Sequence, residues 1–142
     1  MILEHFTAMQ ARLEADATLT GKVFAAARVA DNGTLIRDQY VILFGGGPEV
    51  LDDDRFTAPQ RATSKAEFVY TVRAISVTAD GALAVATKVL NQLVGFVPTI
   101  TGRVCERIRL DEGSFGESKA DASAMPPLYF LDADYVLVTR PT

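Results

Sequence analysis

The sequence predicts the α+β fold class, a mixed, mostly antiparallel sheet of about four to five strands with two helices packed on one face. Three observations support this class. Two segments carry apolar residues at helical spacing, several shorter segments are apolar in the manner of strands, and the order is helix, strands, helix, strands. A parallel sheet would require regular alternation of strands and helices. We expect one domain over residues 1–142, with long loops at about 45–66 and 112–127.

The first helix is expected over residues 2–16, because apolar side chains recur there at spacings of three and four. These positions are Ile2, Phe6, Met9 and Leu13. A short strand is expected from Lys22 to Val29, ahead of the turn signal Asp31-Asn32-Gly33. The segment Gln39 to Phe44 is apolar without alternation, which is typical of a strand buried on both faces.

The clearest strand is expected over Glu67 to Val77, where apolar and polar residues alternate. A second helix follows and runs to about Val94. Thr78 can act as its N-cap, Asp80 suits its first turn, and Gly95 can end it. Its buried stripe is expected to be Leu83, Ala86, Leu90, Leu93 and Val94.

Two later strands complete the predicted sheet. The segment Arg103 to Leu110 is expected to be a strand that turns Val104, Ile108 and Leu110 inward. After the second loop, Leu128 to Val138 is expected as the closing strand. Its inward face is Tyr129, Leu131, Ala133, Tyr135 and Leu137.

Composition and charge limit the class of function. The chain is 49% hydrophobic and 23% charged and has one cysteine, so we expect a core without disulfides, in a reducing cytosol. A net charge of −4 disfavours a general nucleic-acid binder. No basic segment precedes an apolar run at the N-terminus, and the apolar stretches are short, so we expect neither a signal peptide nor a membrane span.

Few residues offer catalytic chemistry. His5 is the only histidine, and we expect it at the exposed end of the first helix. Cys105 lies among arginines that would lower its pKa if it were exposed, but a packing role is more common at mid-strand. One histidine and one cysteine are too few ligands for a zinc site. The consecutive carboxylates of Asp52, Asp53 and Asp54 lack the spacing of a calcium loop. We therefore expect no enzyme, no cofactor and no metal.

One constellation of charges remains. Arg107 and Arg109 share one strand face, as do Asp132 and Asp134 on the last strand. If these two strands pair, the four residues form cross-strand ion pairs on the exposed side of the sheet. The alternative is that the same residues form a seam between subunits, and the sequence leaves both open.

The overall pattern resembles the tail terminator (tail-to-head joining) proteins and related minor tail proteins of long-tailed bacteriophages. The resemblance covers most of the chain. It is carried by the opening helix, a late strand pair ending near Arg140, and four segments between them. These segments are Leu19–Phe24, Tyr40–Phe44, Phe68–Ser76 and Ala82–Val94.

The resemblance implies a virion assembly protein that forms a hexameric ring, which caps the tail tube and joins it to the head. The implied partners are further copies of the chain, the tail tube and head-connector proteins, and DNA would pass the lumen without specific binding. The implied location is the host cytoplasm during assembly and then the virion tail. The expected subunit contacts or lumen positions, besides the four charged residues above, are Leu51, Asp52, Asp53, Asp54, Arg55, Phe56, Arg61 and Lys65.

Other functions stay open at this point. The main alternative is a small, non-catalytic ligand-binding or regulatory α/β domain with a pocket lined by Phe44, Phe68 and Tyr129. An enzyme that uses carboxylates alone is the third reading. The ligand-binding function requires a cavity, and the carboxylate enzyme requires carboxylates that converge in a cleft.

Overall fold

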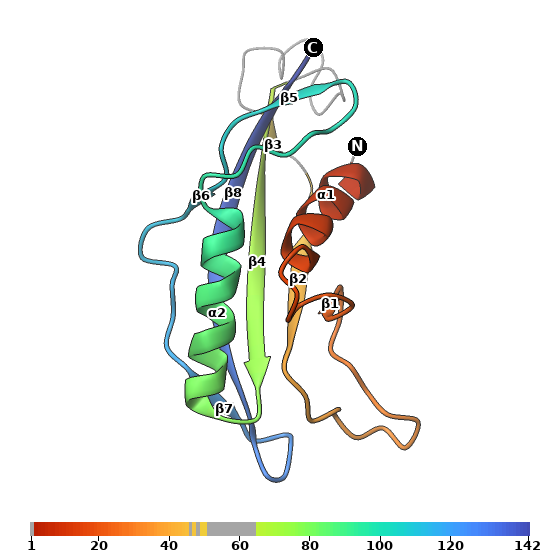
Figure 1. The fold of residues 1–142 in the computed structure, drawn as a ribbon, viewed down its shortest axis with the longest axis vertical. Coiled ribbons are helices and arrows are strands. Elements are labelled where there is room, and N and C mark those ends of the chain that lie inside the picture. Colours follow the sequence, from red (N-terminus) through yellow and green to blue (C-terminus); the bar gives the residue numbers. More distant parts are fainter. Residues whose placement is uncertain (1, 46, 48, 51–64) are drawn as a thin grey trace.

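The computed structural model describes residues 2–45, 47, 49–50 and 65–142 (Figure 1). One eight-stranded sheet has the order β1-β2-β4-β8-β5, and two helices cover one of its faces. The elements are α1 (Ile2–Glu14), β1 (Val23–Phe24), β2 (Tyr40–Gly45), β3 (Glu49–Val50), β4 (Ala66–Ser76), α2 (Ala79–Leu93), β5 (Arg103–Cys105), β6 (Arg109–Leu110), β7 (Lys119–Asp121) and β8 (Leu128–Pro141). The predicted α+β class is confirmed.

Three long strands form the middle of the sheet. Strand β4 lies between β2 and β8 and pairs with both in antiparallel register, with Val72 opposite Leu43 on one side and Ala133 on the other. Strand β1 adds the parallel pairing, to β2. The short strand β3 pairs with β4, and β5, β6 and β7 pair with β8. The sheet is therefore mostly antiparallel, as expected.

The core lies between the helices and one face of the sheet. Alternate residues of β4 and β8 point into it, because successive strand side chains point to opposite faces. The buried residues are Phe68, Tyr70, Val72 and Ala74 of β4 and Leu131, Ala133, Tyr135 and Leu137 of β8. Met9 and Leu13 of α1 and Val85, Val89 and Leu93 of α2 pack against them. Both helices therefore lie on one face, as the sequence predicts (Figure 1).

The ends of α2 follow the sequence closely. The Thr78 Oγ1 accepts a hydrogen bond from the Gly81 N–H at 3.0 Å, which is the N-cap interaction. Val94 is the C-cap, and Gly95 follows it with φ of 84°, a conformation that glycine adopts without strain. The Gly95 N–H donates to the Ile108 carbonyl at 2.8 Å, so the end of the helix is tied to the chain entering β6.

The predicted buried stripe of α2 is partly wrong. Ala86 and Leu93 are buried, but Leu83 and Val94 are 44% and 45% exposed and Leu90 is half-buried. The helix carries a second, smaller apolar stripe, and that one faces the sheet. Its members are Ala82, Val85, Ala86, Val89 and Leu93. The sheet face below already holds large aromatic side chains, so the narrower stripe allows the helix to pack more closely.

The predicted strands at residues 22–29 and 103–110 are longer than those observed. In the second case the Glu106 N–H still donates to the Val138 carbonyl of β8, but the chain then turns away from β8 and the Ile108 N–H donates to the Phe96 carbonyl. This excursion buries Ile108 but leaves Val104 40% exposed, so the inward assignment of Val104 is wrong. The predicted loop at 112–127 also contains the short strand β7.

Candidate assembly surfaces

The sheet has an open face opposite the helices, which we define by Phe44 of β2, Thr71, Val69 and Arg73 of β4, and Asp132 and Asp134 of β8. Phe44 and Val69 are 40% and 41% exposed. Where β2 begins and β4 ends, the same face is covered by a second apolar cluster of Tyr40, Ile42, Ile75, Ala124 and Leu128. This cluster explains why Tyr40 and Ile42 are buried on their side of β2, as predicted for a strand covered on both faces.

An ion pair crosses the middle of the open face. The Arg73 Nε and Nη2 donate to the two carboxylate oxygens of Asp132 at 2.8 and 3.0 Å. The guanidinium also lies over the Phe130 ring, 4.4 Å from its centroid. The hydrogen bond to Asp132 raises the pKa of Arg73, with burial acting in the opposite direction. Next to this pair, the Thr71 hydroxyl donates to Asp134 Oδ1 at 2.7 Å.

The predicted pairs between Arg107 or Arg109 and the two aspartates do not form. Strand β4 is the long neighbour of β8 on the other side, and its register places Arg73 opposite Asp132 and Thr71 opposite Asp134. Strand β6 reaches β8 further along, where Arg109 lies opposite Val136. The Arg109 Nη2 instead lies 3.9 Å from Glu67 Oε2, and Arg107 lies outside the strands.

Most of the predicted loop contacts lie outside the described residues. These are Leu51, Asp52, Asp53, Asp54, Arg55, Phe56 and Arg61. Lys65 is described, and its Nζ lies 3.8 Å from Glu106 Oε1. The role of these residues in subunit contacts stays a prediction.

The expectation that His5 is exposed is wrong. His5 is fully buried, its ring stacks on Phe68 with centroids 4.0 Å apart, and its Nε2 lies 3.0 Å from the Thr139 Oγ1. Thr139 is also fully buried, so this histidine and hydroxyl cannot meet a substrate. The spacing of four between His5, Met9 and Leu13 is the signal that could have placed His5 on the buried face.

Cys105 is half-buried at the end of β5. Burial raises the pKa of its thiol, and nearby Arg103 lowers it to a smaller extent. A thiol with a raised pKa is mostly protonated at neutral pH, so it is a weak nucleophile.

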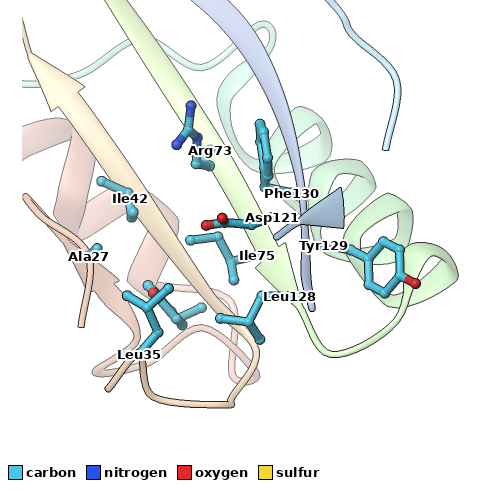
Figure 2. Close-up of a pocket in the computed structure, with 10 residues that line it drawn as sticks. Ala27, Leu35, Ile42, Arg73, Ile75, Asp121, Leu128, Tyr129 and Phe130 are labelled. Atoms are coloured by element: carbon cyan, nitrogen blue, oxygen red, sulfur yellow. The ribbon is translucent and has the colours of Figure 1, made fainter. Parts of the chain in front are cut away.

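A small cavity lies where the open face meets the covered part of the sheet (Figure 2). Its volume is about 50 Å³, and its lining is mostly apolar with the charged groups of Arg73 and Asp121. The Ser123 hydroxyl, 2.6 Å from Asp121 Oδ1, lowers the pKa of Asp121. Ligand pockets hold about 300–1,000 Å³, so this cavity is too small for an ordinary metabolite. Of the pocket residues predicted from the sequence, Tyr129 lines the cavity, whereas Phe68 lies on the helix side of the sheet.

A larger, open groove of about 330 Å³ lies between α1 and the segment after α2. The small side chains of Ala8, Ala11 and Ala15 line one wall, and Phe96 lines the other. Arg12 extends along the groove and connects the two helices: its Nε donates to the Gln92 carbonyl at 2.7 Å. The alanines of α1 carry no sequence signal of their own, so this groove is not predictable from the sequence.

Over the described ranges, no group of three or more His, Cys, Asp or Glu side chains is placed to hold a metal ion. In that same part of the chain, neither helix has the length and apolar character that crossing a membrane requires. What the described geometry offers is a two-layer domain with a partly apolar open face and a groove on its helical side.

Comparison with known proteins places the fold in a structural context. No family model and no curated protein sequence matches this chain. A solved structure described as the virion of a native gene transfer agent particle contains a chain with the same fold. The TM-score is 0.63 at 19% sequence identity, over 94% of this chain and 92% of the other. At that identity the likeness concerns the fold, and it extends over nearly the whole length of both chains.

Proposed function

We propose that this chain is a non-enzymatic virion assembly protein of phage-like particles. The observation that carries the proposal is the shared fold with a chain of the gene transfer agent virion, matched almost end to end in both directions. Fold alone does not determine function, so the surfaces must be compatible with it. An open sheet face and a lateral groove suit protein contacts, and the cavity is too small for a metabolite.

Within that class, we infer the role of a tail terminator. Copies of the chain form a ring that caps the tail tube and joins it to the head, with the tube and head-connector proteins as partners. The net charge of −4 supports this role, since an acidic lumen lets DNA pass without binding it. The protein then occurs in the host cytoplasm during assembly and in the virion tail afterwards.

Tail tubes assembled from the tube protein of the same particle test the role. Adding the purified chain should place extra density at one end of each tube in electron micrographs and stop further growth of that end. Binding along the sides of the tube, or continued growth in the presence of excess chain, would contradict the terminator role. The Cys105→Ser variant serves as a matched control and should cap as the unchanged chain does, because the thiol has no part in the activity.

A further inference from the structure

The groove beside α1 contains a cation that is already held in place. The Arg12 Nε is bonded to the Gln92 carbonyl at 2.7 Å, the Gln92 amide donates back to the Arg12 carbonyl at 3.3 Å, and the guanidinium lies 4.2 Å from the centroid of the Phe96 ring. In the described part of the chain, no carboxylate pairs with Arg12. The terminal amino groups of Arg12 can therefore take an anionic partner at little entropic cost.

A segment of opposite character lies at another edge of the molecule. Residues 111–117 join β6 to β7 along the edge of β8 and contain Asp111, Glu112 and Glu117, with no basic residue. Phe115, in the middle of the segment, is 37% exposed. An aromatic side chain flanked by carboxylates is complementary to an apolar groove that contains an arginine.

The segment is held rigidly, which suits it to a docking role. The Asp111 N–H bonds to the Asp134 carbonyl at 2.9 Å, and the Gly116 N–H bonds to the Asp132 carbonyl at 2.9 Å. Between them, the Ser114 hydroxyl donates to the Asp111 carbonyl at 2.6 Å. These contacts fix the backbone on both sides of Phe115, so little entropy is lost when its ring is buried.

We propose that Phe115 and its acidic neighbours on one copy of the chain dock into the Arg12 groove of the next copy. A single copy cannot make this contact, because α1, which forms one wall of the groove, and the chain joining β6 to β7 lie on opposite sides of α2 (Figure 1). The groove, about 330 Å³, has room for one aromatic ring. Two different patches meet, so the contact is heterologous, which is the kind of contact that builds a ring when its rotation closes. The inference rests on the proposed ring and names the surfaces that build it.

Two variants separate the halves of this contact. Phe115→Ala removes the aromatic side chain, and Ala11→Glu places a carboxylate in the groove at an exposed helical position that tolerates it. Thr7→Glu adds the same charge to an exposed position of α1 outside the groove and is the matched control. The mass of each protein is measured in solution as a function of concentration, alone and in mixtures.

Each of the two variants should associate about tenfold or more weakly than the unchanged chain, whereas Thr7→Glu should not differ from it. A mixture of Phe115→Ala and Ala11→Glu retains one intact groove and one intact Phe115, so it should form a complex of two chains and nothing larger. If the unchanged chain assembles and both variants assemble equally well, the inference is wrong while the ring stands. If the mixture stays monomeric although the unchanged chain assembles, the inference is also wrong. If the unchanged chain assembles neither in solution nor at the end of the tail tube, the proposed ring fails with it.

Discussion

The two faces of the sheet differ although the same strands build them. On the helix side of β4 and β8, every second residue from Phe68 to Ala74 and from Leu131 to Leu137 is apolar and almost completely buried. On the open face, the intervening positions hold Val69, Thr71 and Arg73 on β4 and Asp132 and Asp134 on β8, and they remain partly exposed. The residues of the helix side are apolar because they are buried, whereas the polar residues of the open face are held by side-chain pairs between neighbouring strands. Substitutions on the helix side should therefore lower the free energy of unfolding strongly, and substitutions on the open face should lower it less.

The largest expected effect comes from the helix side. Leu137→Ala should lower the free energy of unfolding by about 2–5 kcal/mol, because it opens a cavity at a fully buried position. Val69→Ala on the open face is the matched control, and its effect should be well under half as large, since that side chain is 41% exposed. Urea unfolding of both variants measures the difference. Equal losses at the two positions would mean that the faces do not differ as described.

A smaller effect of opposite sign is expected at Tyr135. Its side chain is fully buried, and its hydroxyl has no hydrogen-bond partner within the described structure. Burial raises the pKa of Tyr135 to about 12, so the group stays neutral at ordinary pH. A buried, unsatisfied hydroxyl costs free energy, so Tyr135→Phe should raise the free energy of unfolding by about 1 kcal/mol. Thermal unfolding tests this, and a clear loss of stability would show that the hydroxyl has a partner.

The smallest effect is expected on the open face itself. A double-mutant cycle with Arg73→Ala and Asp132→Ala should give a coupling of about 0.2–1 kcal/mol, since the pair is bidentate but about one-third exposed. The coupling should weaken with added salt. An equal cycle between Arg109 and Asp132 should give none, because the register keeps these residues apart. Coupling between Arg109 and Asp132 without coupling between Arg73 and Asp132 would support the pairing expected from the sequence.

The same contrast explains what could be predicted from the sequence. The N-cap at Thr78, the alternation in β4 and β8 and the placement of both helices on one face follow from local patterns, and the structure confirms them. The partners of Asp132 and Asp134 depend on which strand lies next to β8, and local pattern does not contain that information. The orientation of α2 differs from the prediction for a similar reason: the helix has two apolar stripes, and the shape of the sheet decides between them.

His5 and Arg12 show the limit for functional residues. The exposure of His5 is predicted from its position on α1 alone, and no role is predicted for Arg12. Both side chains are placed by distant elements: His5 by Phe68 and Thr139, and Arg12 by Gln92 and Phe96. A single histidine or arginine in a helix carries no sign of such partners. The groove exists only because the fold brings α1 next to the segment that follows α2.

The most direct test of the proposed role is the mass of the assembled protein. One chain has a mass of 15.3 kDa. Native mass spectrometry of the purified chain, and of the complex released from capped tail tubes, should give one defined large multiple of that mass, because a closed ring has a fixed number of copies. A mass of one chain in both samples would contradict the account, since no ring could then exist either in solution or at the end of the tube.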